Sequence, residues 1–253
     1  MIKLGKMADI DEMMYSCGLK ILHPGGIEKT DEMARACKIG KDKKILDIGS
    51  GKGVTACYLA KKYGCNVLGI DLSERMIKYG RKIAEKKGLT EKVQFIKLDA
   101  HELPFENNTF DIVLAECATV LMDKNKVFSE FIRVTKSGGY VGDLEMIWQK
   151  PPTKELVFEV HDVWEGFNTM LLEDWGRLYD KLGLSEIKAV DFSEMIPDMD
   201  EAMKKELGLK GMIKMGFKLL LHSDLRKAMN INSKIFKEYS DYIGYGYIIG
   251  KRT

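Results

Sequence analysis

Short apolar runs alternate along the chain with longer segments of helical spacing, which is the pattern of an α/β protein. The apolar runs predict strands at residues 45–48, 66–71, 93–99, 111–117 and 140–147. The intervening segments predict helices at residues 52–63, 74–87 and 124–136. Because strands that alternate with helices form parallel pairs, we expect a mostly parallel sheet with helices on both faces.

A glycine-rich turn follows the first of these strands. Gly49, Gly51 and Gly53 stand at every second position, where a missing Cβ lets the backbone turn sharply and approach a ligand. The helix after the turn presents free N–H groups to whatever lies over it. The stretch therefore predicts a nucleotide-type crevice at the carboxyl end of the first strand. A dinucleotide fingerprint would need Gly or Ala at Val54, so a nicotinamide-dependent dehydrogenase is disfavoured.

An aspartate ends the second strand, twenty residues after Gly51. This spacing is close to that at which an acidic side chain binds ribose hydroxyls. An ionised carboxylate accepts two hydrogen bonds from a vicinal diol without competing donors. Since Ser73 can cap the next helix, we expect Asp71 to be free for a ligand.

The pattern Asp47-x-Gly-x-Gly-x-Gly53 resembles motif I of the class I S-adenosylmethionine-dependent methyltransferases of the ubiquinone and menaquinone type. Three further features of that family follow in order, namely Asp71, Asp99-Ala100 and Gly138-Gly139. The resemblance covers residues 43–147. It implies a Rossmann-like seven-stranded sheet, mostly parallel with an antiparallel last strand, and helical lid insertions. It also implies S-adenosylmethionine as the cofactor and S-adenosylhomocysteine as the product.

The resemblance assigns each part of the cofactor to a segment of the chain. It places the methionine part on the glycine turn, the ribose at Asp71 and the adenine at Asp99 and Ala100. Leu72 and Met76 are candidates to reach the adenine. The expected cofactor-binding residues are Asp47, Gly49, Ser50, Gly51, Gly53, Asp71, Leu72, Met76, Asp99, Ala100 and Glu116.

The fourth strand ends in Glu116 and Cys117, where the resemblance places the methyl acceptor. The Asn/Asp-Pro-Pro-aromatic motif of enzymes that methylate nucleobase or glutamine amide nitrogens is not found there. Cys117 also lacks the preceding proline of cytosine C5 enzymes. A base helps if the acceptor is a hydroxyl or a protonated amine. Candidate bases are His23, His161, Glu116 and Tyr15, but the sequence assigns no catalytic residue.

A thiol or metalloid acceptor is a further hypothesis. The segment from Tyr15 to Cys17 loosely resembles the arm of arsenite methyltransferases, and Cys117 is expected near the methyl group. Against this hypothesis, no cysteine follows Cys117, whereas those enzymes use cysteines in their C-terminal half. The candidate substrate or lid residues are Tyr15, Cys17, His23, Cys117, His161 and Trp164.

We expect one methyltransferase domain over residues 1–253. Its parts are an N-terminal helical lid (1–42), a cofactor-binding core (43–147) and helical cap or substrate insertions (148–175 and 194–240). The lid is expected to hold helices at 9–20 and 27–39, the second ended by Gly40. After the first insertion we expect a helix from Glu173 to near Gly183. Two strands complete the sheet, at 187–192 and 245–251, the last one antiparallel at the edge.

Composition narrows the class of protein. The net charge of the 253 residues is +2, which gives no reason to expect a nucleic-acid partner or an RNA methyltransferase. No apolar run has the length of a membrane span and the start lacks a signal-peptide core, so we expect a cytoplasmic protein without a membrane partner. The apolar stripe in 194–240 favours a core or homodimer surface over a membrane anchor. Five scattered cysteines fit a reducing compartment and predict no metal site.

The leading hypothesis is methyl transfer from S-adenosylmethionine to a small-molecule acceptor by in-line displacement. The sequence leaves open whether nitrogen, oxygen, carbon or sulfur attacks. The alternatives are a non-catalytic protein that binds S-adenosylmethionine or S-adenosylhomocysteine, and a methyltransferase of the thiol or arsenite type.

Overall fold

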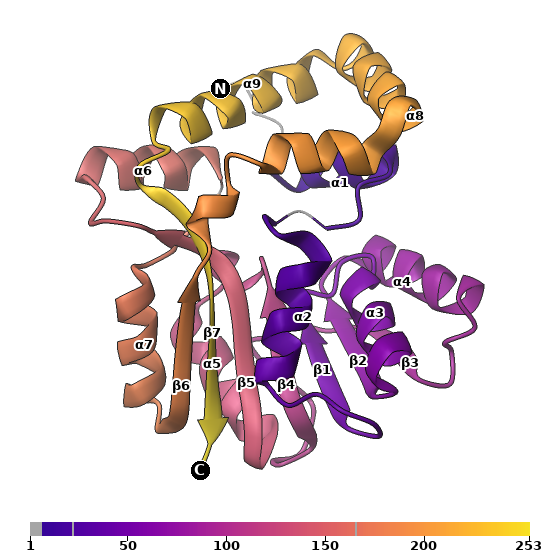
Figure 1. Cartoon of the computed structure of the whole chain (residues 1–253), viewed down its shortest axis with the longest axis vertical. Helices are drawn as coiled ribbons and strands as arrows, with labels where there is room; N and C mark the ends of the chain where they lie inside the picture. The colour runs from indigo at the N-terminus through magenta and orange to yellow at the C-terminus, as the bar shows by residue number, and fades with distance from the viewer. Residues whose placement is uncertain (1–6, 22, 165) are drawn as a thin grey trace.

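A seven-stranded sheet of order β3-β2-β1-β4-β5-β7-β6 runs through the described part of the computed structural model (Figure 1). The structure describes residues 7–21, 23–164 and 166–253. Residues 1–6, 22 and 165, which fall in the expected lid and cap segments, lie outside the described residues. The strands are β1 (Lys44–Ile48), β2 (Asn66–Asp71), β3 (Val93–Lys97), β4 (Phe110–Glu116), β5 (Thr135–Trp148), β6 (Leu184–Asp191) and β7 (Ile243–Arg252).

The sheet confirms the predicted fold class, since β1 to β5 pair in parallel and the last strand, β7, is antiparallel. The expected edge position of the last strand is wrong, because β7 lies between β5 and β6. The burial patterns explain the order. Residues 243–250 of β7 are all buried, as suits an inner strand, whereas β6 is buried only at Leu184 and its other residues are half-buried or exposed. A partly exposed strand can be covered on one face only and so tolerates the edge.

Helices cover both faces of the sheet and its upper end. The helices are α1 (Met7–Cys17), α2 (Gly26–Ala36), α3 (Val54–Tyr63), α4 (Glu74–Lys86), α5 (Lys124–Val134), α6 (Lys154–Val163), α7 (Leu172–Lys181), α8 (Met199–Leu221) and α9 (Ser223–Glu238). One hydrophobic core lies under α2, α3 and α4, and a second lies under α5 and α7. Figure 1 shows α1, α6, α8 and α9 as a layer beyond the carboxyl ends of the parallel strands.

The ends of two helices differ from the sequence prediction. Helix α2 ends at Ala36, with Cys37 as its C-cap and Lys38 in the left-handed region at φ 56°. Gly40 therefore does not end the helix, because the chain has already turned. Helix α3 begins at Val54 rather than Lys52, since Gly53 adopts φ 71° and forms the N-cap.

A third hydrophobic core joins α1 to α8 and α9 in the layer above the sheet. It contains Met13, Met14 and Cys17 of α1 together with Leu207 of α8. A Cβ on Gly211 would lie 2.5 Å from the carbonyl oxygen of Cys17, so this glycine allows α8 to approach α1 closely. None of the helices in the described residues is at once long and apolar enough to cross a membrane.

Two glycines of α8 give a matched test of this contact. We expect Gly211→Ala to lower the free energy of unfolding by about 1–3 kcal/mol, because the new methyl group overpacks the α1 contact. Gly216 has no atom within 4 Å of an added Cβ. Gly216→Ala should therefore raise the free energy of unfolding by about 0.5–1 kcal/mol, the gain of Ala over Gly in a helix. Urea denaturation measures both changes, and equal effects of the two variants would contradict this packing.

Candidate active site

The glycine turn between β1 and α3 has left-handed backbone at Gly49, Gly51 and Gly53, with φ of 64°, 50° and 71°. A Cβ on Gly49 would lie 2.5 Å from the Cβ of Ala118, and one on Gly53 would lie 2.2 Å from the Phe95 ring. Packing therefore requires glycine at both positions. A Cβ on Gly51 would meet only the Tyr15 hydroxyl at 3.8 Å and the Gly49 carbonyl oxygen at 4.0 Å. Packing within the protein therefore does not require glycine at position 51, and the Tyr15 hydroxyl lies near this position.

Asp71 holds this turn in place from the end of β2. Its carboxylate accepts hydrogen bonds from the N–H of Gly51 at 3.0 Å and the N–H of Ser73 at 2.8 Å. The Ser73 hydroxyl caps α4 by accepting from the Met76 N–H, as the sequence predicts. The expectation that Asp71 is free is wrong, because it braces the turn. Two of the roughly four acceptor positions of a carboxylate remain for a ligand.

Two acidic side chains lie buried beside the turn. Asp47 of β1 is 2% exposed, and burial together with the nearby charges of Glu116 and Asp71 raises its pKa well above the ordinary value. Glu116 of β4 accepts a hydrogen bond from the Thr55 hydroxyl at 2.7 Å. Burial acts to raise the pKa of Glu116, but the interactions with His23 and Thr55 outweigh it, and the pKa lies below its ordinary value.

His23 brings the N-terminal segment to the same place. Its Nδ1 lies 3.0 Å from the carbonyl oxygen of Pro24, which can only accept, so Nδ1–H donates there. The other ring nitrogen, Nε2, then faces Oε2 of Glu116 at 3.7 Å. His23 is 6% exposed. The segment after α1 therefore contributes a buried side chain to the end of β4.

Several buried polar atoms around the turn have no hydrogen-bond partner within the described residues. They are Asp47 Oδ2, Ser50 Oγ, Glu116 Oε1 and His23 Nε2. Most buried polar groups in folded proteins are paired. Their concentration at one place indicates a site that a polar ligand completes.

Helix α1 approaches the turn from above. The Lys52 ammonium lies 4.9 Å from the centroid of the Tyr15 ring, and Glu12 forms an ion pair with Arg75 in the first turn of α4. The Tyr15 hydroxyl thus lies near Gly51, and its role as a lid residue stays a prediction. Cys17 does not face the site, because it is buried between α1 and α8.

The loop after β4 contains Cys117, an exposed residue with φ of 52°. Sequence analysis missed the group that holds this loop. The carboxylate of Glu145 in β5 accepts from the N–H of Ala118 at 2.5 Å and of Thr119 at 2.7 Å. The Thr119 hydroxyl donates to Asp143 at 2.7 Å. The sequence offered one indication of this role, since Asp143 and Glu145 stand at alternate positions of the otherwise apolar run 140–147.

The remaining predicted residues separate into two groups. Leu72 is exposed after β2, and Asp99 is exposed after β3, so both lie at the carboxyl ends of neighbouring strands. Met76 is half-buried in α4 and Ala100 is buried. By contrast, His161 is exposed on α6, and the buried Trp164 donates its indole N–H to Asn232 of α9 at 2.9 Å. Trp164 thus joins α6 to α9.

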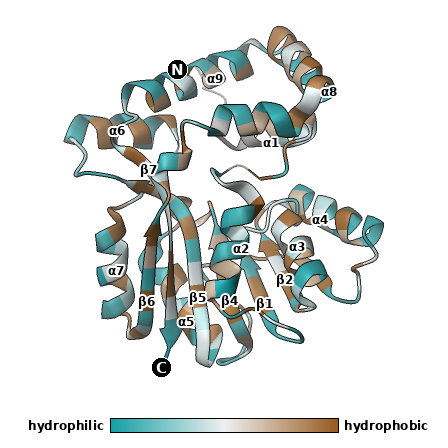
Figure 2. Ribbon diagram, in the orientation of Figure 1, coloured by the Kyte–Doolittle hydropathy of each residue, from teal (hydrophilic) through white to brown (hydrophobic). Residues whose placement is uncertain are grey.

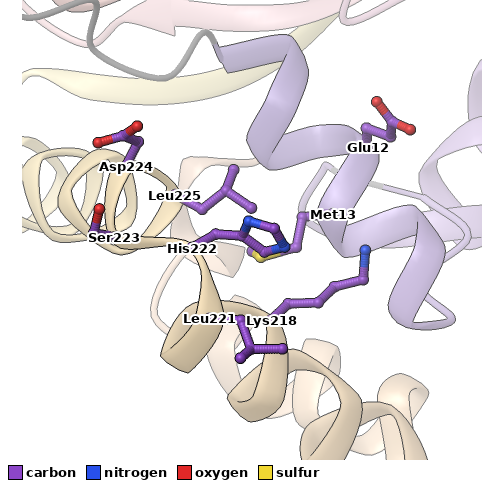
Figure 3. Close-up of a pocket in the computed structure, with 8 residues that line it drawn as sticks. All are labelled: Glu12, Met13, Lys218, Leu221, His222, Ser223, Asp224 and Leu225. Carbon is purple, nitrogen blue, oxygen red and sulfur yellow. The ribbon is translucent and has the colours of Figure 1, made fainter.

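A cavity of about 460 Å³ lies away from these groups, between α1 and the α8–α9 corner (Figure 3). It is lined by Glu12, Met13, Lys218, Leu221, His222, Ser223, Asp224 and Leu225. None of the predicted site residues lines it, so the chemistry of the glycine turn is separate from this cavity.

Comparison with known proteins agrees with this geometry. Residues 45–139 match a family model described as a methyltransferase domain. A norajmaline N-methyltransferase of Rauvolfia serpentina is 33% identical over 176 residues, covering 66% of this chain and 60% of the relative. Methyltransferase GfsG of Streptomyces halstedii is 25% identical over 236 residues, covering 90% of this chain and 80% of the relative.

The fold agrees with a solved structure as well. Phosphoethanolamine N-methyltransferase 2 of Haemonchus contortus, in complex with S-adenosyl-L-methionine, has a TM-score of 0.80 and 21% identity, covering 99% of this chain and 58% of that chain. The chain spans about half to three fifths of the length of three curated relatives, 48%, 60% and 54%. The ubiquinone and menaquinone type stays a prediction. The matched domain and the relatives show that this chain is similar to methyltransferases, and its fold is that of a methyltransferase solved with S-adenosyl-L-methionine.

Proposed function

We propose that the protein transfers a methyl group from S-adenosylmethionine to a small-molecule acceptor. The observation that carries this proposal is the group of buried polar atoms of Asp47, Ser50 and Glu116 that have no hydrogen-bond partner within the described residues and lie beside the glycine turn. The cofactor has a positively charged ammonium and sulfonium, and the site offers two buried carboxyl groups. The residues present therefore fit this ligand.

In this proposal the glycine turn and the carboxyl ends of the strands each bind a different part of the cofactor. Asp47 and Glu116 bind the cationic methionine part, which compensates the buried carboxyl group of Asp47. Asp71 receives the ribose hydroxyls on its remaining acceptor positions. Leu72, Met76, Asp99 and Ala100 surround the adenine. When bound, the cofactor supplies a methyl group activated by its sulfonium.

The acceptor would lie between the lid and the loop after β4. In-line transfer depends on alignment of the two reactants and on exclusion of water. Tyr15 lies near Gly51, His23 lies beside Glu116 at the end of β4, and Glu145 fixes the loop that carries Cys117. His23 is the favoured base, because it is buried at the site whereas His161 is exposed on α6. The names of the two N-methyltransferases above support an amine nitrogen as the attacking atom.

The alternatives fit less well. An arsenite-type mechanism would use Cys17 together with Cys117, and the burial of Cys17 between α1 and α8 counts against it. A non-catalytic cofactor-binding protein would keep the glycine turn and Asp71 but show no turnover. Dimer formation and a cytoplasmic location stay predictions.

The first test is calorimetric titration with S-adenosylhomocysteine. We expect saturable binding that Asp71→Ala weakens by about 1–3 kcal/mol, because a charge-assisted contact to the ribose is lost. Asp241→Ala is the matched control, since Asp241 is an exposed acid near Lys150. Transfer of labelled methyl from S-adenosylmethionine to a panel of amines then separates an enzyme from a binding protein. Absence of binding by the unaltered protein would overturn the proposal.

Asp47→Asn should change stability and binding in opposite directions. The folded-state pKa of Asp47 lies above 3.8, so above that pH the group destabilises the ligand-free protein. The variant should therefore have a higher melting temperature without ligand at pH 7.5. It should also bind S-adenosylhomocysteine about tenfold or more weakly, because the ammonium loses its buried partner. If binding is unchanged, Asp47 does not contact the ligand.

Glu145→Gln tests the electrostatics of the acceptor loop. Burial raises the pKa of Glu145 to about 7, against an ordinary value of 4.5. Because the folded-state pKa is the higher one, this group lowers the free energy of unfolding as pH rises from about 4.5 to about 7. The variant keeps an acceptor oxygen and should show a smaller fall over that range in urea titrations. Glu106→Gln, at an exposed site, serves as the control and should leave the fall unchanged.

A further inference from the structure

Helix α8 has two apolar faces beyond the kink at Gly208, where φ is 59°. The inner face packs in the third hydrophobic core through Met212, Met215 and Leu219. The outer face is exposed, and Figure 2 shows hydrophobic residues along this helix at the outer corner of the molecule. The outer residues and their exposed fractions are Leu209 77%, Ile213 51%, Phe217 62%, Leu220 71% and Leu221 74%.

These five outer residues, called here the α8 stripe, follow helical spacing. Residues four apart lie on one side of a helix, and Leu209, Ile213 and Phe217 are four apart. The α8 stripe cannot pack in the third hydrophobic core, because α8 already faces α1 with its other side, where Gly211 approaches the Cys17 carbonyl oxygen. The sequence prediction of a core surface is thus right for the inner face only.

A row of lysines runs beside the α8 stripe. Lys210, Lys214 and Lys218 repeat at the same spacing one position later, and residues 207–221 contain no Asp or Glu. The Lys214 ammonium donates to the Ser16 carbonyl oxygen at 2.7 Å. Figure 3 shows Lys218 and Leu221 at the cavity between α1 and the α8–α9 corner, so the row and the stripe end at a hollow. The surface therefore combines apolar area with positive charge.

The charge of this surface distinguishes between two partners, a second copy of the chain and an anionic lipid bilayer. A twofold contact of two α8 stripes would bring two lysine rows near each other, and residues 207–221 contain no acid, although Glu12 and Asp224 line the cavity beside Lys218. An anionic lipid surface matches both features, because acyl chains accept the apolar side chains and head groups attract the lysines. Helices with Leu and Phe on one side and Lys beside them commonly lie in the plane of a membrane interface.

We propose that the α8 stripe and its lysine row bind the surface of an anionic lipid bilayer. The helix lies in the interface without crossing the bilayer, in agreement with the absence of a spanning helix from the described residues. Figure 1 shows α8 in the layer above the sheet, so docking leaves the sheet and its flanking helices outside the lipid. This proposal does not rest on methyl transfer, and its test needs no cofactor.

Vesicle flotation of the full chain tests the proposal. We expect binding to vesicles of phosphatidylcholine with 30 mol% phosphatidylglycerol, and at least fivefold less to phosphatidylcholine alone. Binding should weaken when NaCl is raised from about 0.05 M to about 0.5 M, because salt screens the lysine row. Phe217→Gln with Leu220→Gln should lower the bound fraction at least fivefold. Lys210→Gln with Lys218→Gln should lower it on anionic vesicles only.

Matched controls come from the same layer. Phe158 of α6 is 75% exposed, more than Phe217 at 62%, so Phe158→Gln removes an exposed aromatic ring outside the stripe and should leave binding unchanged. Lys227→Gln removes an exposed lysine of α9 outside the lysine row and should also leave binding unchanged. Because all the altered residues lie at the surface, circular dichroism should show unchanged folding.

Three results would overturn the proposal. The first is no binding of the unaltered protein to anionic vesicles. The second is equal loss of binding in Phe158→Gln and in the stripe variant. The third is a dimer in light scattering that Phe217→Gln with Leu220→Gln dissociates, which would show that a second copy covers the stripe.

Discussion

The hydrogen bond from the Gly51 N–H to the Asp71 carboxylate is the contact on which the candidate active site depends. The turn between β1 and α3 has left-handed backbone and needs an external tie to stay in one conformation. Asp71 gives that tie and also binds the Ser73 N–H at the start of α4. The Ser50 N–H adds a bond to the Ile70 carbonyl oxygen at 2.8 Å. The end of β2 therefore fixes the conformation of the turn.

Acidic side chains at the carboxyl ends of three neighbouring strands set the electrostatics of the site. Burying a carboxylate is unfavourable unless hydrogen bonds or opposite charges compensate it. Glu116 has such partners in Thr55 and His23, and Glu145 has backbone N–H groups. Asp47 keeps an oxygen without a partner in the described residues. Burial and the neighbouring acids therefore disfavour the charged form of Asp47 and raise its pKa.

The layer above the sheet combines two roles in neighbouring helices. Helix α1 places Tyr15 near the glycine turn and buries Cys17 against α8 on its other side. Helix α8 packs on α1 with one face and leaves the opposite face to solvent. The helix that places Tyr15 near the turn thus packs directly on the helix with the exposed apolar face.

The sequence by itself determined the α/β class, the glycine turn and the position of Asp71 at a strand end, because periodicity and turn chemistry act over a few residues. It did not determine partners that are far apart in the chain. The Ala118 N–H finds Glu145 across 27 positions, and β7 inserts between β5 and β6. The spacing of apolar residues in α1 also could not show whether Cys17 packs against α8 or faces the candidate active site. Tertiary packing decided these points, since burial depends on which surfaces meet and not on local sequence.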